Sequence, residues 1–148
     1  IIDAGIPVMG HIGLLPQSYH LLSGYSIQGK TRNEAKKIYN DALAIQDSGA
    51  FAVVLEGIPS DLAEKITNAL DIPTIGIGAG PNCDGQIQVF HDILGLYEDI
   101  IPKHTKHYGK LNIEIQNILM EYKNEVEKKK FPSSRNFFTN KDPTLINN

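Results

Sequence analysis

The stretch Phe51-Ala52-Val53-Val54-Leu55 is a continuous apolar run, and Glu56 follows it directly. A short apolar run of this kind is typical of a parallel strand that is buried on both faces. Similar runs occur from Ile6 to Leu14 and from Ile72 to Ile77, and a weaker one extends from Gln86 to Phe90. The sequence therefore predicts four strands, with Glu56 at the C-terminal end of the second.

Amphipathic helices are predicted in the segments that join these strands. Thr31 and Glu34 form a Thr-x-x-Glu capping box at the start of the first helix, and Gly49 is a natural stop for it. Ser60 can cap a second helix, and a last helix is predicted over about 112–130. Alternation of strands and helices indicates a parallel sheet with crossover helices.

The connection between the third and fourth predicted strands does not fit this pattern. Eight residues separate Ile77 from Gln86, which is too few for a crossover helix with its loops. Either this crossover is a degenerate turn or the fourth strand is wrongly assigned.

Composition excludes several classes of protein. The 148 residues suit one domain, and 14 Lys and Arg against 17 Asp and Glu give a net charge of −3, so we expect no nucleic-acid partner. The lone Cys83 rules out an internal disulfide framework. Neither a transmembrane run nor a signal peptide is visible, so we expect no membrane association and a cytoplasmic location.

Ligands of parallel α/β folds meet the loops that follow the C-terminal ends of the strands. Three segments should converge there: Gly10 to Gly13 with His11, Glu56 with Gly57, and Gly76 to Gly80. Glu56 would lie at the rim of an apolar interior, where a carboxylate can act as a general base. The alternative is that Glu56 turns to solvent or caps the helix after Ser60.

The other candidate residues each have two interpretations. His11 could donate a hydrogen bond to a substrate oxygen, or it could be a buried histidine bonded to backbone. The glycines from 76 to 80 could cradle an anion, or they could line a tight strand end. Cys83 has no His–Asn arrangement near it that would indicate a nucleophile. His104 and His107, beside two lysines, indicate a solvated surface rather than a metal site.

Several blocks together resemble the ketopantoate hydroxymethyltransferase family. The stretch 10–18, Gly-His-Ile-Gly-Leu-Leu-Pro-Gln-Ser, is similar to the family's Gly-His-x-Gly-Leu-x-Pro-Gln motif, and Val54-Leu55-Glu56 is similar to its strand-end glutamate. Further blocks follow in the family's order, namely 75–80, Cys83 to Gln86, His91-Asp92 and Ile101-Pro102-Lys103. The resemblance runs from about Ile6 to about Tyr122.

The resemblance implies a (β/α)8 TIM barrel of the phosphoenolpyruvate/pyruvate type. It implies transfer of a hydroxymethyl group from 5,10-methylenetetrahydrofolate to 3-methyl-2-oxobutanoate, which gives 2-dehydropantoate in pantothenate biosynthesis. Mg2+ would bind the keto acid, a glutamate matched by Glu56 would accept the proton, and His11 would bind or orient the substrate. The family also implies a homo-oligomer in the cytoplasm.

A whole barrel needs about 250 residues, and the blocks that would carry the magnesium ligands are missing from this sequence. We therefore expect the C-terminal half of the enzyme, about strands 5 to 8, over 1–130, followed by a loose polar tail over 131–148. The first residue, which is not Met, points the same way. The metal would bind no residue of this chain, its partner would be the N-terminal half of the barrel, and the fragment alone would be inactive.

Two other readings stay open. The chain could be a non-catalytic half-barrel or a subunit of a split enzyme that needs a partner chain. It could also belong to a related enolate-forming lyase or mutase of the same barrel superfamily.

Overall fold

The computed structural model describes residues 1–15, 26–97 and 102–139. These residues form two compact units, one of residues 1–15, 26–90 and 102–106 and the other of residues 91–97 and 107–139. The motif residues Pro16, Gln17 and Ser18, together with Ile101, lie outside the described residues. The division into a half-barrel over 1–130 and a tail over 131–148 stays a prediction.

The first unit is built on a sheet of four parallel strands in the order β1-β2-β3-β4. The strands are β1 (Met9–Gly13), β2 (Ala52–Glu56), β3 (Thr74–Ile77) and β4 (Gly85–Gln86). All four predicted strands are present, which confirms the parallel α/β class. The fourth has only two residues, however, so its predicted extension to Phe90 is wrong: Phe90 begins a short helix instead.

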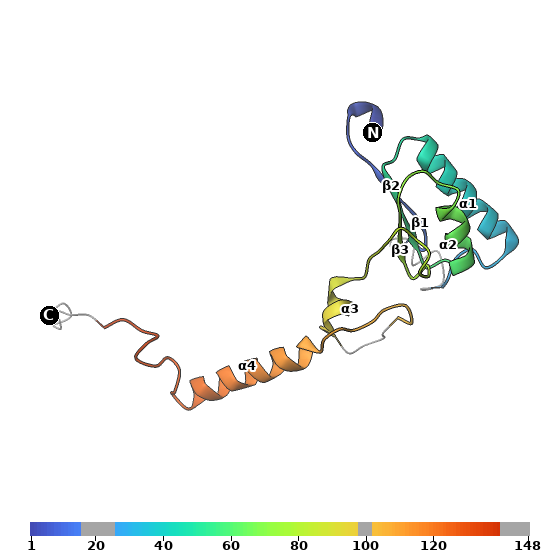
Figure 1. Cartoon of the computed structure of the whole chain (residues 1–148). Coiled ribbons are helices and arrows are strands. Elements are labelled where there is room, and N and C mark those ends of the chain that lie inside the picture. The colour runs from blue at the N-terminus through green and yellow to red at the C-terminus, as the bar shows by residue number, and fades with distance from the viewer. Residues whose placement is uncertain (16–25, 98–101, 140–148) are drawn as a thin grey trace. The chain divides into compact units, whose positions relative to one another are not determined.

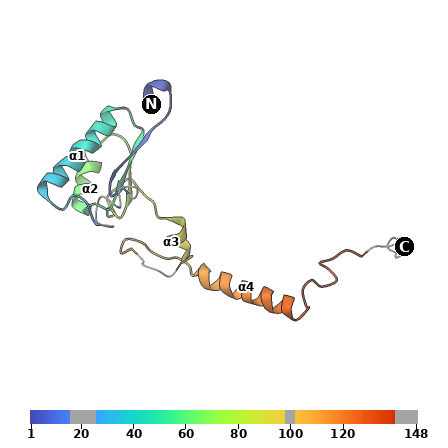
Figure 2. The ribbon, with the colours of Figure 1, turned by 180° about the vertical axis from the view of Figure 1, so that it is seen from behind.

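Two helices, α1 (Arg32–Asp47) and α2 (Ser60–Thr67), lie on the same side of the sheet (Figures 1 and 2). The capping box of α1 is confirmed, because Glu34 N–H donates to Thr31 Oγ1 at 3.3 Å and Thr31 N–H donates to Glu34 Oε2 at 3.2 Å. Gly49 follows the end of α1 with φ +86°, as its predicted role as a stop requires. A short 3-10 helix (Ile2–Ala4), which was not predicted, precedes β1.

The predicted capping role of Ser60 is wrong. Pro59 is the N-cap residue of α2 and makes no side-chain cap hydrogen bond, while Ser60 is the first helical residue. The fixed φ of proline suits the entry to a helix without a side-chain acceptor. The side chain of Ser60 instead lies against Gly80, where a Cβ atom on Gly80 would be only 2.3 Å from Ser60 Cβ.

The second unit contains α4 (Leu111–Glu127), and α3 (Phe90–Leu94) begins at the boundary between the units. The predicted last helix over 112–130 is confirmed, although it ends three residues early. None of the residues of α4 is buried, and its apolar side chains Ile118, Leu119 and Tyr122 are more than half exposed. No helix in the described parts of the chain is long and apolar enough to cross a membrane.

The two faces of the sheet differ in how fully they are covered. Ile12, Val53 and Leu55 face the helices and are buried with a core cluster that includes residues of α1 and α2: Ile38, Ala42, Leu62, Ala63 and Ile66. Val53 and Leu55 have no exposed surface at all. This face is the hydrophobic core of the first unit.

The opposite face of the sheet, which we call the open face, carries the alternate residues of each strand. Met9 is 46% exposed, and His11, Val54 and Ile75 also keep part of their surface exposed. The prediction that these strands are buried on both faces is therefore wrong for this chain by itself. Ile77, near the edge of this face, is buried with only 8% exposed.

A side-chain clasp joins β3 to β4 and takes the place of a crossover helix. The Asp84 carboxylate accepts hydrogen bonds from Thr74 N–H at 2.8 Å and from Thr74 Oγ1 at 2.9 Å, through Oδ2 in both cases. These bonds lower the pKa of Asp84, with the backbone bond as the largest cause. Of the two explanations offered for the short connection, the degenerate turn is therefore correct, and Asp84 holds it closed.

We expect Gly80→Ala to destabilise the protein more than Gly49→Ala. Both glycines have left-handed φ values, +82° and +86°, so both variants carry the conformational penalty of about 1 kcal/mol. A Cβ at Gly49 would make only ordinary contacts at 3.5 Å, whereas one at Gly80 would collide with Ser60. The difference should be about 1–3 kcal/mol, read from urea unfolding midpoints. Equal midpoints would show that Gly80 does not pack closely against Ser60.

We expect the stabilising effect of Asp84 to depend on pH. Because its folded pKa lies below the unfolded value of about 3.9, the stabilisation is present above the unfolded pKa and is lost as pH falls through the folded pKa. Asp84→Asn should therefore lower the unfolding midpoint at pH 7, and the difference from the unchanged protein should shrink in acid. Asp41→Asn, an exposed change on α1, is the control. If the unfolding midpoint of Asp84→Asn stays equally far below that of the unchanged protein at acid pH, the Asp84 carboxylate does not stabilise the connection between β3 and β4.

Candidate active site

The C-terminal ends of the first three strands form one edge of the sheet, which we call the strand-end edge. The strand register pairs Gly13 with Glu56 and Glu56 with Ile77. Because the strands are parallel, the loops that follow them leave from this same edge. The predicted convergence of three glycine-containing segments at one edge is confirmed.

Glu56 and His11 are hydrogen-bonded to each other on the open face. His11 Nε2 lies 2.9 Å from Glu56 Oε2, and the exposed fractions of the two side chains are 35% and 15%. A carboxylate in its ionised form only accepts hydrogen bonds, and an imidazole N–H can donate one, so the two side chains are chemically matched as acceptor and donor. Neither alternative for Glu56 holds, because it neither turns to solvent nor caps α2.

His11 is not the buried histidine bonded to backbone, and its predicted contact with a substrate oxygen stays a prediction. Its imidazole contacts the carboxylate of Glu56 rather than a backbone group. Within the described residues, Glu56 Oε1 accepts no hydrogen bond. One carboxylate oxygen is thus held by the imidazole, and the other is left to meet a ligand.

The backbone of Glu56 is fixed from both neighbouring strands. Leu14 N–H donates to the Glu56 carbonyl at 2.8 Å, and Gly57 N–H donates to the Ile77 carbonyl at 2.9 Å. Gly13 allows this approach: it has φ +94°, and a Cβ there would lie 2.1 Å from the Glu56 carbonyl oxygen. A side chain at position 13 would therefore displace Glu56 itself.

Packing accounts for the glycines between 76 and 80. A Cβ on Gly76 would meet Cys83 Sγ at 3.0 Å, and one on Gly78 would meet His104 Cγ at 2.9 Å. Gly80 lies against Ser60, and its carbonyl accepts a hydrogen bond from Gln86 Nε2 at 2.9 Å. The space beside each glycine is filled by protein, which favours the tight strand end over the anion cradle.

The structure gives Cys83 a structural role rather than a nucleophilic one. Burial raises the pKa of the Cys83 thiol, and this is the largest of its causes. A raised pKa leaves less of the reactive thiolate near neutral pH. Together with its contact to Gly76, this agrees with the sequence, which showed no partner for a catalytic cysteine.

The two histidines after β4 have different environments. His104 is exposed, as predicted, but its ring lies over Gly78 just beyond β3. The prediction of a solvated side chain is wrong for His107, because its Nε2 atom is buried and has no hydrogen-bond partner among the described residues. Its other ring nitrogen faces the position of Gly95. Sequence alone gave no signal for either contact.

No group of three or more His, Cys, Asp or Glu side chains in the described ranges is arranged to hold a metal ion. Glu56 is the carboxylate that the structure places at the strand-end edge with a histidine partner.

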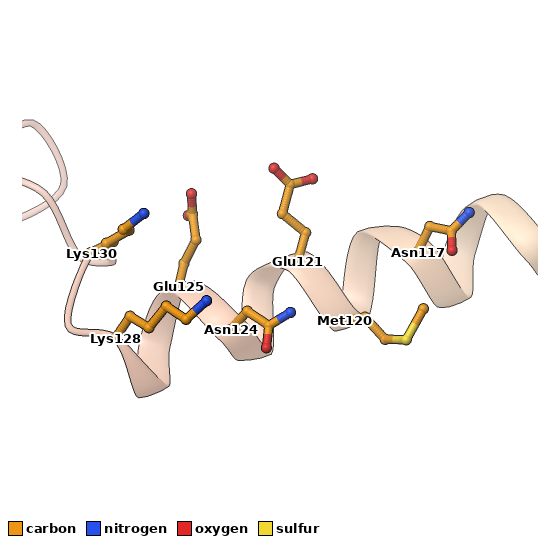
Figure 3. A pocket seen from close by; sticks show the side chains of 7 residues that line it. All are labelled: Asn117, Met120, Glu121, Asn124, Glu125, Lys128 and Lys130. Carbon is orange, nitrogen blue, oxygen red and sulfur yellow. The ribbon is translucent and has the colours of Figure 1, made fainter.

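A groove of about 430 Å³ lies along α4 and the residues that follow it, lined by Met120, Lys128 and Lys130 among others (Figure 3). Its lining side chains come from one helix and the segment after it, and none belongs to the strand-end edge. The groove therefore adds no group to the candidate active site.

Comparison with known proteins identifies close relatives of this chain. The family model described as ketopantoate hydroxymethyltransferase matches residues 1–134. A protein of Geobacter metallireducens named 3-methyl-2-oxobutanoate hydroxymethyltransferase is 55% identical over 94% of this chain and 52% of its own length. Proteins with the same name from Dehalococcoides mccartyi and Carboxydothermus hydrogenoformans are 55% and 51% identical, also over 94% of this chain. The chain spans about half the length of these relatives.

Proposed function

Because the chain belongs to the ketopantoate hydroxymethyltransferase family, we propose that it is part of an enzyme that transfers a hydroxymethyl group from 5,10-methylenetetrahydrofolate to 3-methyl-2-oxobutanoate. The product would be 2-dehydropantoate, on the route to pantothenate. The observation that carries this proposal is the carboxylate of Glu56 at the strand-end edge, only 15% exposed and hydrogen-bonded to His11.

We further propose that the chain forms the C-terminal half of a (β/α)8 barrel, about strands 5 to 8. Three observations support it: the strands are parallel and adjacent in chain order, the helices cover one face of the sheet, and the other face keeps exposed surface. In a complete barrel the inward faces of all strands fill one interior. The remaining strands would cover Met9, Val54 and Ile75.

Glu56 would act as the general base. The C3–H bond of the keto acid breaks, its proton passes to Glu56, and its electron pair remains as an enolate. C3 of the enolate then bonds to the methylene carbon carried by the folate, both bonds from that carbon to the folate nitrogens break, and water supplies the hydroxyl group. The two nitrogens take up the proton held by Glu56 and the second proton of that water, which returns Glu56 to its starting form. The Glu56 side chain is only 15% exposed, and its register partner Ile77 is 8% exposed, which suits a base that must take a carbon-bound proton.

His11 would position this base. Its hydrogen bond to Oε2 restrains the Glu56 side chain and leaves Oε1 without a hydrogen bond among the described residues. A preorganised carboxylate needs no reorientation before proton transfer. His11 would thus act through Glu56, and direct contact with the keto acid, the role the resemblance implies, remains a proposal.

Mg2+ bound to the keto acid would make the C3 proton more acidic by drawing electron density from the keto oxygen. We propose that its ligands lie on the N-terminal half of the barrel, which agrees with the lack of any group of three or more His, Cys, Asp or Glu side chains placed to hold a metal in the described residues. We also propose a homo-oligomer, which the exposed apolar side chains of α4 support, and a cytoplasmic location.

We expect Glu56→Gln to reduce turnover by about 10²–10⁴-fold, the range that a general base contributes. Glutamine keeps the shape and can still accept the His11 hydrogen bond, so KM should change little. The protein for this test is the assembled enzyme, in which this chain is joined to the N-terminal half of the Geobacter metallireducens relative. Turnover is measured as 2-dehydropantoate formation, with Glu64→Gln on α2 as the control. Near-normal turnover of Glu56→Gln would show that another group is the base.

We expect the 148-residue chain alone to be inactive, since its open face and unpaired strand edges lack the rest of the barrel. Mixing it with a separately expressed N-terminal half should restore product formation. This result would support a split or divided enzyme over a non-catalytic half-barrel. Strong turnover by the chain alone, or none from the mixture and the joined enzyme, would contradict the proposal.

A further inference from the structure

A groove of about 390 Å³ lies between α1 and α2 in the first unit. Three cationic side chains line it: Lys30 from the segment before α1, Arg32 at the first position of α1, and Lys65 on α2. Its apolar lining comes from Ala35 and Leu62. The groove thus combines an apolar surface with positive charge from two separate helices.

The positive charge of this groove is not neutralised by the protein. Within the described residues, Lys30, Arg32 and Lys65 form no ion pair. Asp61 also lines the groove but pairs with none of them, so the four side chains leave a net charge of about +2. The nearby acid Glu34 is held in the capping box with Thr31.

The groove opens beside the strand-end edge. Pro59, which lines it, follows Glu56 by three residues, so the two Cα atoms are at most about 11 Å apart. On the other side, Gln28 N–H donates to the Gly57 carbonyl at 2.8 Å, and the next residue, Gly29, lines the groove. A long ligand with its reacting end at Glu56 could therefore reach this groove with its other end.

We propose that this groove binds the carboxylate-bearing glutamate tail of the folate co-substrate. This proposal rests on the proposed function. The keto acid is small and must stay at Glu56, whereas the folate is long and carries its carboxylates at the end remote from the methylene group. Cations that form no ion pair among the described residues and are set back from the base match that arrangement, and the apolar lining suits the aromatic segment between the two ends.

The test compares co-substrates with one and with three glutamates in the assembled enzyme. The unchanged enzyme should have a lower KM for the triglutamate form. Lys30→Gln with Lys65→Gln should raise that KM roughly tenfold, the size expected when two exposed ion pairs are lost, with kcat within about twofold. Lys36→Gln with Lys37→Gln removes the same charge from exposed positions of α1 outside the groove and should leave both KM values unchanged.

Equal KM values for the two co-substrates in the unchanged enzyme would overturn the proposal. It would also be overturned if Lys36→Gln with Lys37→Gln raised the KM for the triglutamate form as much as Lys30→Gln with Lys65→Gln does. Calorimetric binding of pteroyltriglutamate to the same three proteins gives a readout that does not need turnover. If no product forms with either co-substrate, the proposed function fails. In that case, the proposed role of the groove is still supported if the Lys30 and Lys65 changes abolish the binding of pteroyltriglutamate. It is overturned if that binding is left intact.

Discussion

The register of β2 between β1 and β3 is the constraint on which the rest of the structure depends. Side chains alternate between the two faces of a strand, so Leu55 enters the core while Glu56 reaches the open face. A slip of one residue would exchange them, placing a carboxylate in the core and leucine at the strand-end edge. The complete burial of Val53 and Leu55 against α1 and α2 prevents that slip. Packing on one face thereby fixes the chemistry on the other.

Local pattern was enough to predict most of the secondary structure. The apolar runs and the capping box of Thr31 and Glu34 depend on neighbours in sequence, and those elements are present. The failures involve contacts between distant segments. Ser60 packs against Gly80 rather than capping its helix, and the fourth strand is only as long as its clasp to Thr74 allows. Neither contact has a local signature.

In the candidate site, too, features that depend on local sequence could be predicted, and contacts between distant segments could not. Glu56 could be identified because it directly follows an apolar strand, but its bond to His11 joins residues 45 positions apart and depends on strand pairing. The basic groove was missed for the same reason. Lys30 lies just before α1 and Lys65 lies on α2, and each by itself resembles an ordinary surface lysine. Only the packing of α1 on α2 brings them together.

The order of the strands also has a consequence for how the sheet forms. Paired residues are separated by 43 positions between β1 and β2, by 21 between β2 and β3, and by 10 between β3 and β4. Closing a short loop costs less chain entropy than closing a long one. Loop closure alone therefore favours the pairing beside Asp84 most and the pairing of β1 with β2 least, by about 0.6 kcal/mol for each doubling of loop length. The hydrogen bond between His11 and Glu56 therefore depends on the strand pairing with the longest connecting segment, and it can form only when β1 and β2 are paired in the correct register.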